Sequence, residues 1–374
     1  MINIKKIGAT ALVGSLVAMS ANAGELAVTG NATVSYSHGG AITAQGTDSF
    51  TGDQASFGHN TAINFVGTGE LDNGWNFVMA VSGKDNMAAG QTSSYTSMTM
   101  GSLGTLTTGT HTGGAASKYD EEVPQAYEQA SDALSTGSAS SNKIGDQLDS
   151  AAILYNSPEF DISGATVSFD VDYAPQANDA QASDGGQVAA NTAIGAGYGL
   201  GVTVKYDGGQ FGVYGNEVEN TTDKETATLA SNERDSSEYV AYAKYSMGPL
   251  AFGVSRSYLD AGKNAAGTAQ NLGQALRTAG GYFENDQMSV AYNVNDALSV
   301  SYTRSVDTYN GAPVRTVAAA MSDFSVDTTT NAIQAAYSMG AMSLKAYNMQ
   351  VKNPQYDSDK ETLSVTEVAL GLAF

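Results

Sequence analysis

The chain has 374 residues, a formal net charge of −21, no cysteine and three histidines. The lack of cysteine excludes a disulfide framework and a thiol nucleophile. His38, His59 and His111 show no ligand spacing, so the sequence predicts neither a metal site nor a cofactor. The strong negative charge repels polyanions and argues against a nucleic-acid-binding role.

Residues 1–23 have the features of a secretory signal peptide. Lys5 and Lys6 give a basic start, residues 7–19 form a short apolar core, and an A-x-A cleavage site follows. We therefore expect an exported mature chain of residues 24–374. The alternative is a membrane-spanning helix, which needs about 18 consecutive apolar residues, and no stretch of the chain reaches that length. A membrane protein with this sequence must therefore cross as a closed barrel.

Segments of alternating apolar and polar residues follow one another along the remaining chain. Because successive side chains of a strand point to opposite faces, each segment predicts a two-faced strand. In chain order the predicted strands cover residues 26–36, 57–65, 75–81, 95–100, 105–110, 151–156, 165–173, 194–206, 211–218, 239–247, 250–258, 288–294, 298–304, 333–339, 342–347 and 363–374.

The connections between these strands are alternately short and long. Tight turns are predicted near residues 72, 102, 160, 208, 248, 296 and 340, and the intervening connections are long and polar. Tight turns at one end and long loops at the other are typical of outer-membrane barrels. We therefore predict an all-β, transmembrane, antiparallel up-and-down barrel of about 16 strands around a water-filled lumen.

The hairpin from Met288 to Arg304 shows the two faces most clearly. One face carries Val290, Tyr292, Val300 and Tyr302, and the other carries Ser289, Asn293, Ser299 and Ser301. A soluble β-sandwich would also alternate apolar and polar residues. The small, polar second face and the aromatic residues near strand ends favour a barrel in a membrane. We therefore expect the apolar face to point toward lipid and the polar face toward the lumen.

Three motifs resemble the general trimeric porins of Gram-negative outer membranes. Residues 101–109 resemble the turn and strand that lead into the family's constriction loop. Residues 149–160 resemble the strand and Ser-Pro-x-Phe turn that follow this loop. Residues 370–374 resemble the C-terminal strand, whose final aromatic residue, here Phe374, is the signal for barrel-assembly machinery. The resemblance covers essentially the whole sequence after residue 23.

The resemblance implies a passive channel for small hydrophilic solutes and ions in the outer membrane. It also implies a homotrimer that contacts lipopolysaccharide and outer-membrane lipid. In the family the third long loop folds inward and narrows the pore, and residues 111–148 occupy that position. The candidate pore-constriction residues are Asp120, Glu121, Glu122, Glu128 and Asp132. The alternative is that several of these carboxylates bond to the wall or face solvent.

The wall opposite this loop departs from the family. Porins usually carry an arginine cluster there, whereas this chain places Asn31, Thr33, Asn60, Asn64 and Asn76 on the predicted lumen face. Strand phase predicts five other lumen-facing charges, namely Asp170, Asp172, Lys205, Lys244 and Lys345. A mainly acidic lumen concentrates cations, so we expect a cation-preferring pore.

One predicted strand carries a strip of glycines on its lumen face. The strip consists of Gly195, Gly197, Gly199 and Gly201. Without side chains, such a strip either widens the pore or lets a loop pack closely against the wall. The sequence leaves both interpretations open.

No catalytic constellation is present in the sequence. Serine is abundant, but no G-x-S-x-G elbow occurs, and no histidine has a convincing partner. The prediction is therefore a porin and not an enzyme. Two other hypotheses remain, namely a substrate-specific outer-membrane channel and a surface or adhesin barrel with a plugged lumen.

Overall fold

The computed structural model describes residues 24–42, 50–84, 93–110, 114–120, 122–130, 144–145, 148, 150–177, 194–220, 235–260, 262, 281–311, 315–316, 319–320, 324–356, 358 and 361–374. The predicted signal peptide, residues 1–23, lies outside the described residues. No helix in the described part of the chain is long and apolar enough to cross a membrane.

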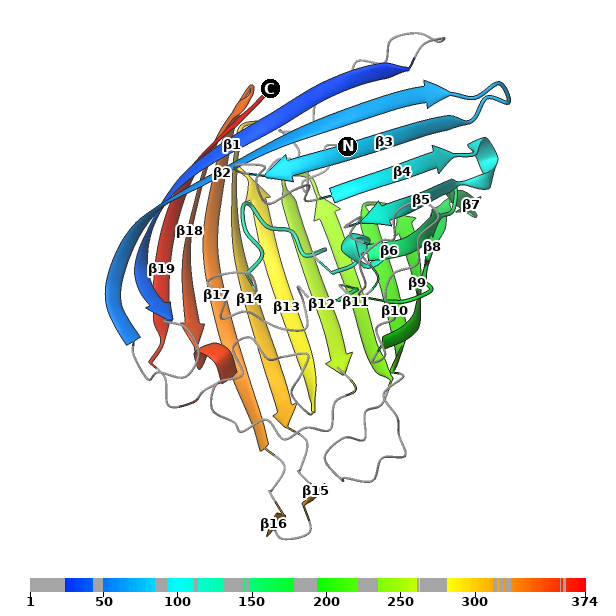
Figure 1. Ribbon diagram of the computed structural model, residues 1–374. Helices are drawn as coiled ribbons and strands as arrows, with labels where there is room; N and C mark the ends of the chain where they lie inside the picture. The colour runs from blue at the N-terminus through cyan, green and yellow to red at the C-terminus, as the bar shows by residue number, and fades with distance from the viewer. Residues whose placement is uncertain are drawn as a thin grey trace.

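Most of the described chain forms one antiparallel sheet of 17 strands (Figure 1). The first nine are β1 (Glu25–Ile42), β2 (Phe50–Glu70), β3 (Asn76–Lys84), β4 (Ser93–Thr99), β5 (Thr105–Thr110), β6 (Ser150–Asn156), β7 (Phe160–Ile162), β8 (Ala165–Ala174) and β9 (Ile194–Tyr206). The others are β10 (Gly209–Asn220), β11 (Ser236–Met247), β12 (Leu250–Asp260), β13 (Tyr282–Asn293), β14 (Leu298–Gly311), β17 (Phe324–Met339), β18 (Met342–Lys352) and β19 (Leu363–Ala373). Two short strands, β15 (Arg315–Thr316) and β16 (Ala319–Ala320), pair separately.

The sheet closes on itself because the first and last strands pair. β1 and β19 are in register from Asn31 opposite Ala373 to Gly39 opposite Val365. β6 and the short β7 both pair with β8, so the described strands form the predicted closed ring of 16. A closed ring leaves no sheet edge, which is the condition for a β-structure to cross a membrane.

The C-terminal residue completes this closure. Phe374 N donates to the Gly30 carbonyl at 3.0 Å, and Gly30 N donates to the Phe374 carbonyl at 3.1 Å. A Cβ atom on Gly30 would lie 2.5 Å from the Phe374 ring. The terminal ring therefore lies over a glycine, where any larger residue would displace it.

The alternation of short turns and long connections is confirmed, with one correction. The turn predicted near residue 160 lies at Ser163-Gly164, where both residues have positive φ, as a tight hairpin requires. Pro158 has no N–H and interrupts the strand, but pairing with β8 resumes at Phe160. Ser157 bridges the gap, because its Oγ accepts a hydrogen bond from Phe169 N at 2.8 Å.

The two faces of the ring differ as the hairpin predicts. Met288 and Tyr302 are 55% and 41% exposed, whereas Ser289, Ser299 and Ser301 are buried. Large exposed apolar side chains continue around the outer surface on β8, β9 and β10. The apolar face is thus the outside of the protein, the reverse of a soluble domain.

Exposed aromatic residues mark both ends of this outer face. Tyr206, Tyr245 and Tyr292 are exposed near the short turns. Near the long connections, Tyr258 lies 6.1 Å from Tyr239 and 5.3 Å from Tyr282, measured between ring centroids. Two such girdles are typical of the two interfaces of a membrane-spanning barrel.

Candidate functional site

A segment between β5 and β6 lies along the inner face of the barrel. We call residues 114–120 and 122–130 the inner segment. Its first part is bonded to two buried aspartates of β8. Ala115 N donates to Asp172 Oδ2 at 2.9 Å, and the Tyr119 hydroxyl donates to Asp170 Oδ2 at 2.6 Å. Lys118 Nζ forms an ion pair with Asp170 Oδ1 at 2.6 Å.

The middle of the inner segment crosses β11 to β14. Glu122 is paired with Lys244 on β11, and both side chains are largely buried. A side chain at Gly253 on β12 would overlap Pro124, so the proline fits against this strand only because the position is a glycine. On β14, Ser301 Oγ accepts a hydrogen bond from Ala126 N at 2.9 Å. The segment therefore follows the wall closely and does not project freely into the lumen.

The last part of the inner segment is bonded to β17 and β19. Tyr127 N donates to Gln334 Oε1 at 2.8 Å, and Gln334 Nε2 donates to the Glu128 carbonyl at 2.5 Å. The Tyr127 hydroxyl donates to Glu367 Oε1 at 2.6 Å. Lys345 Nζ lies 5.1 Å from the Tyr127 ring centroid, within range of a cation–π interaction. From β8 to β19, the inner wall thus binds one continuous stretch of loop.

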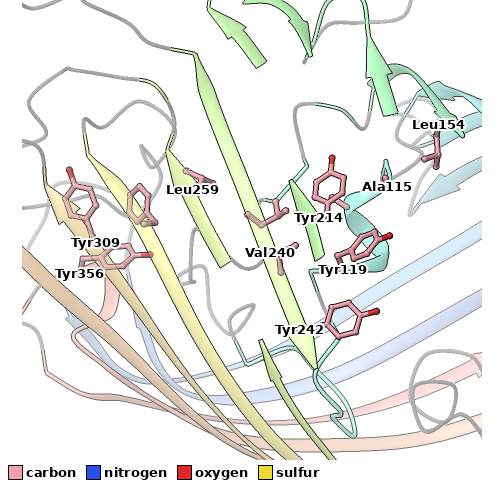
Figure 2. Close-up of a cluster of buried hydrophobic side chains, with 12 residues drawn as sticks. Ala115, Tyr119, Leu154, Tyr214, Val240, Tyr242, Leu259, Tyr309 and Tyr356 are labelled. Carbon is pink, nitrogen blue, oxygen red and sulfur yellow. The ribbon is translucent and has the colours of Figure 1, made fainter. Parts of the chain in front are cut away.

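The glycine strip of β9 supports close packing against the loop. A Cβ atom at Gly201 would overlap the Tyr119 ring, and one at Gly197 would lie 2.6 Å from Leu148 Cδ2. Figure 2 shows Tyr119 beside Tyr214 and Tyr242, and the ring centroids of Tyr119 and Tyr214 are 5.6 Å apart. The strip is therefore filled by side chains of the loop and of the neighbouring strand and does not widen the pore.

The wall formed by β1 to β5 has a different inner surface. Its inner-face residues pair with one another across strands, as in the contact of 3.1 Å between the hydroxyls of Thr99 and Thr105. The Thr107 hydroxyl donates to Ser97 Oγ at 2.9 Å. Register places the following uncharged residues on the inner face of these strands: Asn31, Thr33, Asn60, Asn64, Asn76, Ser97, Thr99, Thr105 and Thr107. These positions carry no charge, and the same face also carries apolar residues such as Val66 and Val78 and, at the short-turn rim, Glu25 and Glu70.

The predicted site residues are distributed over this geometry. Asp120 and Glu128 are half-buried on the inner segment, Glu122 is in the ion pair with Lys244, and Glu121 and Asp132 lie outside the described residues. Asp170 and Asp172 point inward and anchor the segment. Lys205 lies at the short-turn end of β9 and is paired with Glu159.

Sequence reasoning missed the tyrosines of the inner segment. Burial raises the pKa of Tyr119 and Tyr127 well above the usual value, and the hydrogen bonds to Asp170 and Glu367 raise the two pKa values further. Both phenols therefore remain neutral donors to carboxylates. An isolated tyrosine in a loop has no periodicity, so its only sequence signal is its place beside acidic residues.

Comparison with known proteins gives one family match and several solved structures with the same fold. A family model described as Gram-negative porin matches residues 8–371. No curated protein sequence matches the chain. Among solved structures, OmpF of Salmonella typhi in complex with daunomycin aligns with a TM-score of 0.61 and 13% identity, over 93% of this chain and 97% of that one.

Two other structures show the same fold. An anion-selective porin from Comamonas acidovorans aligns with a TM-score of 0.57 and 12% identity, over 94% of this chain and 100% of that one. The outer membrane protein OmpT of Vibrio cholerae lacking loop L8 aligns with a TM-score of 0.60 and 11% identity, over 94% and 100% of the two chains. At these identities the similarity concerns the barrel alone.

Proposed function

The chain belongs to the Gram-negative porin family, and from this premise we propose that it is a cation-preferring porin. The family and the barrel support a channel for passive diffusion across the outer membrane. The finer proposal is a water-filled path for small hydrophilic solutes and ions. The path runs between the inner segment, residues 114–120 and 122–130, and the wall of β1 to β5.

The observation that carries this proposal is the asymmetry of the inner surface. The described inner segment is bonded to the wall from β8 to β19, which supports a permeation path on the other side, beside β1 to β5. The hydroxyl and amide groups of that wall exchange hydrogen bonds with water and polar solutes at little net cost. An adhesin with a plugged lumen would instead need a bulky, apolar or salt-bridged interior on both sides.

The proposed cation preference rests on the charges of the described inner face. The carboxylates include those of Asp120, Glu122, Glu128, Asp170, Asp172, Glu238, Asp307 and Glu367, and the lysines of the same face include Lys118, Lys205, Lys244 and Lys345. An excess of fixed negative charge raises the local cation concentration. Asp120, Glu121, Glu122, Glu128 and Asp132 are the proposed constriction residues of the loop spanning 111–148.

Planar-bilayer recording of the purified protein tests the proposal. We expect stepwise single-channel openings and a reversal potential of cation-selective sign in a KCl gradient. Absence of stepwise openings would identify a plugged barrel, and an anion-selective sign would refute the cation preference. Liposome swelling with sugars, amino acids and dicarboxylates adds a further check. A substrate-specific channel would show an uptake order that does not follow solute size.

We propose a homotrimer whose subunits meet along β2 to β5. The outward positions there include the small and hydroxylated residues Gly67, Gly69, Thr96 and Thr108, beside larger apolar residues such as Phe65, Met79 and Leu106. Small residues let two sheets approach closely, and the larger apolar ones supply area that an interface can bury. Native mass measurement in detergent should give three chains, and a monodisperse single chain would contradict the proposal.

We further propose that lipopolysaccharide contacts the outer surface at β14 to β18. Arg304 and Lys352 line a pocket of about 500 Å³ near the long connections. Neither cation has an ion-pair partner among the described residues. Two unpaired cations beside a membrane interface attract phosphate groups. The double variant Arg304→Glu/Lys352→Glu should therefore retain less lipopolysaccharide on purification than Lys205→Glu, a control at the opposite rim.

Recognition of Phe374 by the barrel-assembly machinery is a proposal as well. The ring is 76% exposed, and it packs over Gly30. Deletion of Phe374 should lower the yield of assembled barrel in the outer membrane, which heat-modifiable migration of the protein on gels measures. An unchanged yield would contradict this role.

A further inference from the structure

A second stretch of chain lies on the inner face of the barrel, far from the inner segment in sequence. It comprises residues 353–356, directly after β18, and we call it the mouth segment. Pro354–Tyr356 form a short 3-10 turn. Asn353 and Tyr356 have φ values of 50° and 56°, a conformation that asparagine tolerates and tyrosine rarely adopts. Such a backbone persists only where its surroundings enforce it.

One hydroxyl on the inner face of β17 holds the backbone of the mouth segment. Thr328 is buried, and its Oγ1 donates to the Asn353 carbonyl at 2.8 Å. The same atom accepts a hydrogen bond from Tyr356 N at 3.1 Å. Asn353 Nδ2 in addition donates to the Asp327 carbonyl at 2.9 Å. These bonds turn the chain over the rim of the barrel and toward the lumen.

The Tyr356 ring is seated in an aromatic cluster on the same inner face. Its centroid lies 5.4 Å from that of Phe283 on β13 and 5.9 Å from that of Tyr309 on β14. Phe283 and Tyr309 are 4.7 Å apart, and none of the three is more than 1% exposed. Figure 2 shows Tyr356 beside Tyr309, apart from the group of Tyr119, Tyr214 and Tyr242. The cluster lies toward the long-connection end of these strands.

The closed sheet does not itself require the mouth segment to fold toward the lumen. β17 and β18 are paired along their length from Thr329 opposite Lys352 to Met339 opposite Met342, so the ladder is complete before the mouth segment begins. A connection that only joined two strands could extend into solvent, as loops usually do. Here it adopts a strained backbone and buries a tyrosine inside the barrel.

We propose that the mouth segment is a second narrowing of the channel, at its outer entrance, and that Tyr356 is the positioning residue that holds it there. The inference rests on the proposed channel function. Tyr356 is buried and uncharged, so it fixes the position of the segment without adding charge to the path. The mouth segment at the entrance therefore discriminates solutes by size, and the inner segment in the middle of the path discriminates them by charge.

The test compares Tyr356→Gly with Thr328→Val and with the control Tyr337→Gly. Glycine adopts positive φ without strain, so Tyr356→Gly removes the ring without adding a backbone conflict. Tyr337 is an exposed outer-face residue near the short turn at Gly340, so its loss weakens the barrel without touching the mouth. All three variants are first checked for assembly by heat-modifiable migration.

Single-channel conductance and one-sided polymer exclusion are then measured for each assembled channel. For Tyr356→Gly we expect conductance to rise and the polymer exclusion limit to increase from the outer side alone. The KCl reversal potential should not change, because no charge is altered. Thr328→Val should shift conductance and exclusion in the same direction by less, and Tyr337→Gly should shift neither.

Two results would overturn the inference while leaving the porin function intact. One is a conducting wild type whose conductance and outer exclusion limit are unchanged in Tyr356→Gly, which would make Tyr356 a purely structural residue. The other is an equal change in exclusion from both sides, which would place the effect at the inner segment. If Tyr356→Gly does not assemble, unchanged values in Thr328→Val decide against the proposal. A wild type without openings refutes the channel itself.

Discussion

The two parts of the inner wall differ in what they bind, and this difference explains where the charges are. From β8 to β19 the wall binds the inner segment, and Asp170 and Lys244 have partners on it, namely Lys118 and Glu122. From β1 to β5 the inner-face hydroxyls bond to one another. Buried charges need partners, so the loop and its wall carry them together. Most charges of the described inner face therefore lie on one side of the barrel.

The largest expected effect follows from detaching the inner segment at its first anchor. Asp172→Leu removes the acceptor for Ala115 N and the Tyr214 hydroxyl. An unsatisfied buried donor costs about 1–3 kcal/mol, so we expect a loss of that order in the free energy of unfolding and frequent current fluctuations. Denaturant titration and bilayer recording measure the two effects. The control Glu159→Gln breaks an exposed ion pair with Lys205, which is worth about 0–1 kcal/mol. An equal loss of unfolding free energy in both variants would contradict the role of Asp172 as an anchor of the inner segment.

A somewhat smaller effect is expected from filling the glycine strip. Gly201→Ala places a methyl group against the Tyr119 ring, whereas Gly67→Ala meets only an ordinary contact at 3.9 Å. Overpacking of this kind costs about 1–3 kcal/mol, and here it displaces the tyrosine that donates to Asp170. Gly201→Ala should therefore lower the denaturation midpoint and raise conductance noise. Similar behaviour of the two alanine variants would show that the strip tolerates side chains.

The strand faces and most turns could be predicted because they follow from local pattern. Alternation fixes which side chains point outward, and Asp207-Gly208 has the positive φ values of a two-residue hairpin turn. The turn at Ser163-Gly164 was misplaced because Pro158 imitates a strand end. Where the pattern is local, the sequence is sufficient.

The partners of the site residues depend on tertiary contacts that no local pattern encodes. The alternation of each strand predicts that Lys244 and Asp172 face inward. It does not predict that their partners are Glu122 and Ala115. Glu122 was expected to line the pore, and its pairing with Lys244 joins residues 122 positions apart. The anchoring roles of Tyr119 and Tyr127 arise in the same way.

Placing positive charge on the wall of β1 to β5 would set it against the mainly acidic inner segment and its wall. Asn31→Arg/Asn60→Arg adds two cations opposite the inner segment, at positions that register places on the inner face. Charges across a narrow aqueous path interact by on the order of 1 kcal/mol, so the cation-to-anion permeability ratio should fall several-fold. Reversal potentials in a KCl gradient measure the ratio, with Asn31→Gln/Asn60→Gln as the uncharged control. An unchanged ratio would mean that ions do not pass beside β1 to β5.

The smallest expected effect is the response of the inner segment to alkali. Burial raises the pKa of Tyr119 above the usual value of a phenol, and the hydrogen bond to Asp170 raises it further. The stability contributed by the neutral phenol is therefore fully present below about pH 10, the unfolded value, and is lost only as the pH rises through the higher folded value. Conductance and the denaturation midpoint should accordingly stay level between about pH 7 and pH 10. A step in conductance or in the denaturation midpoint near pH 10 that occurs in the wild type and not in Tyr119→Phe would show that the Tyr119 phenol ionises normally. In that case the wall from β8 to β19 would hold its loop less firmly than the geometry indicates.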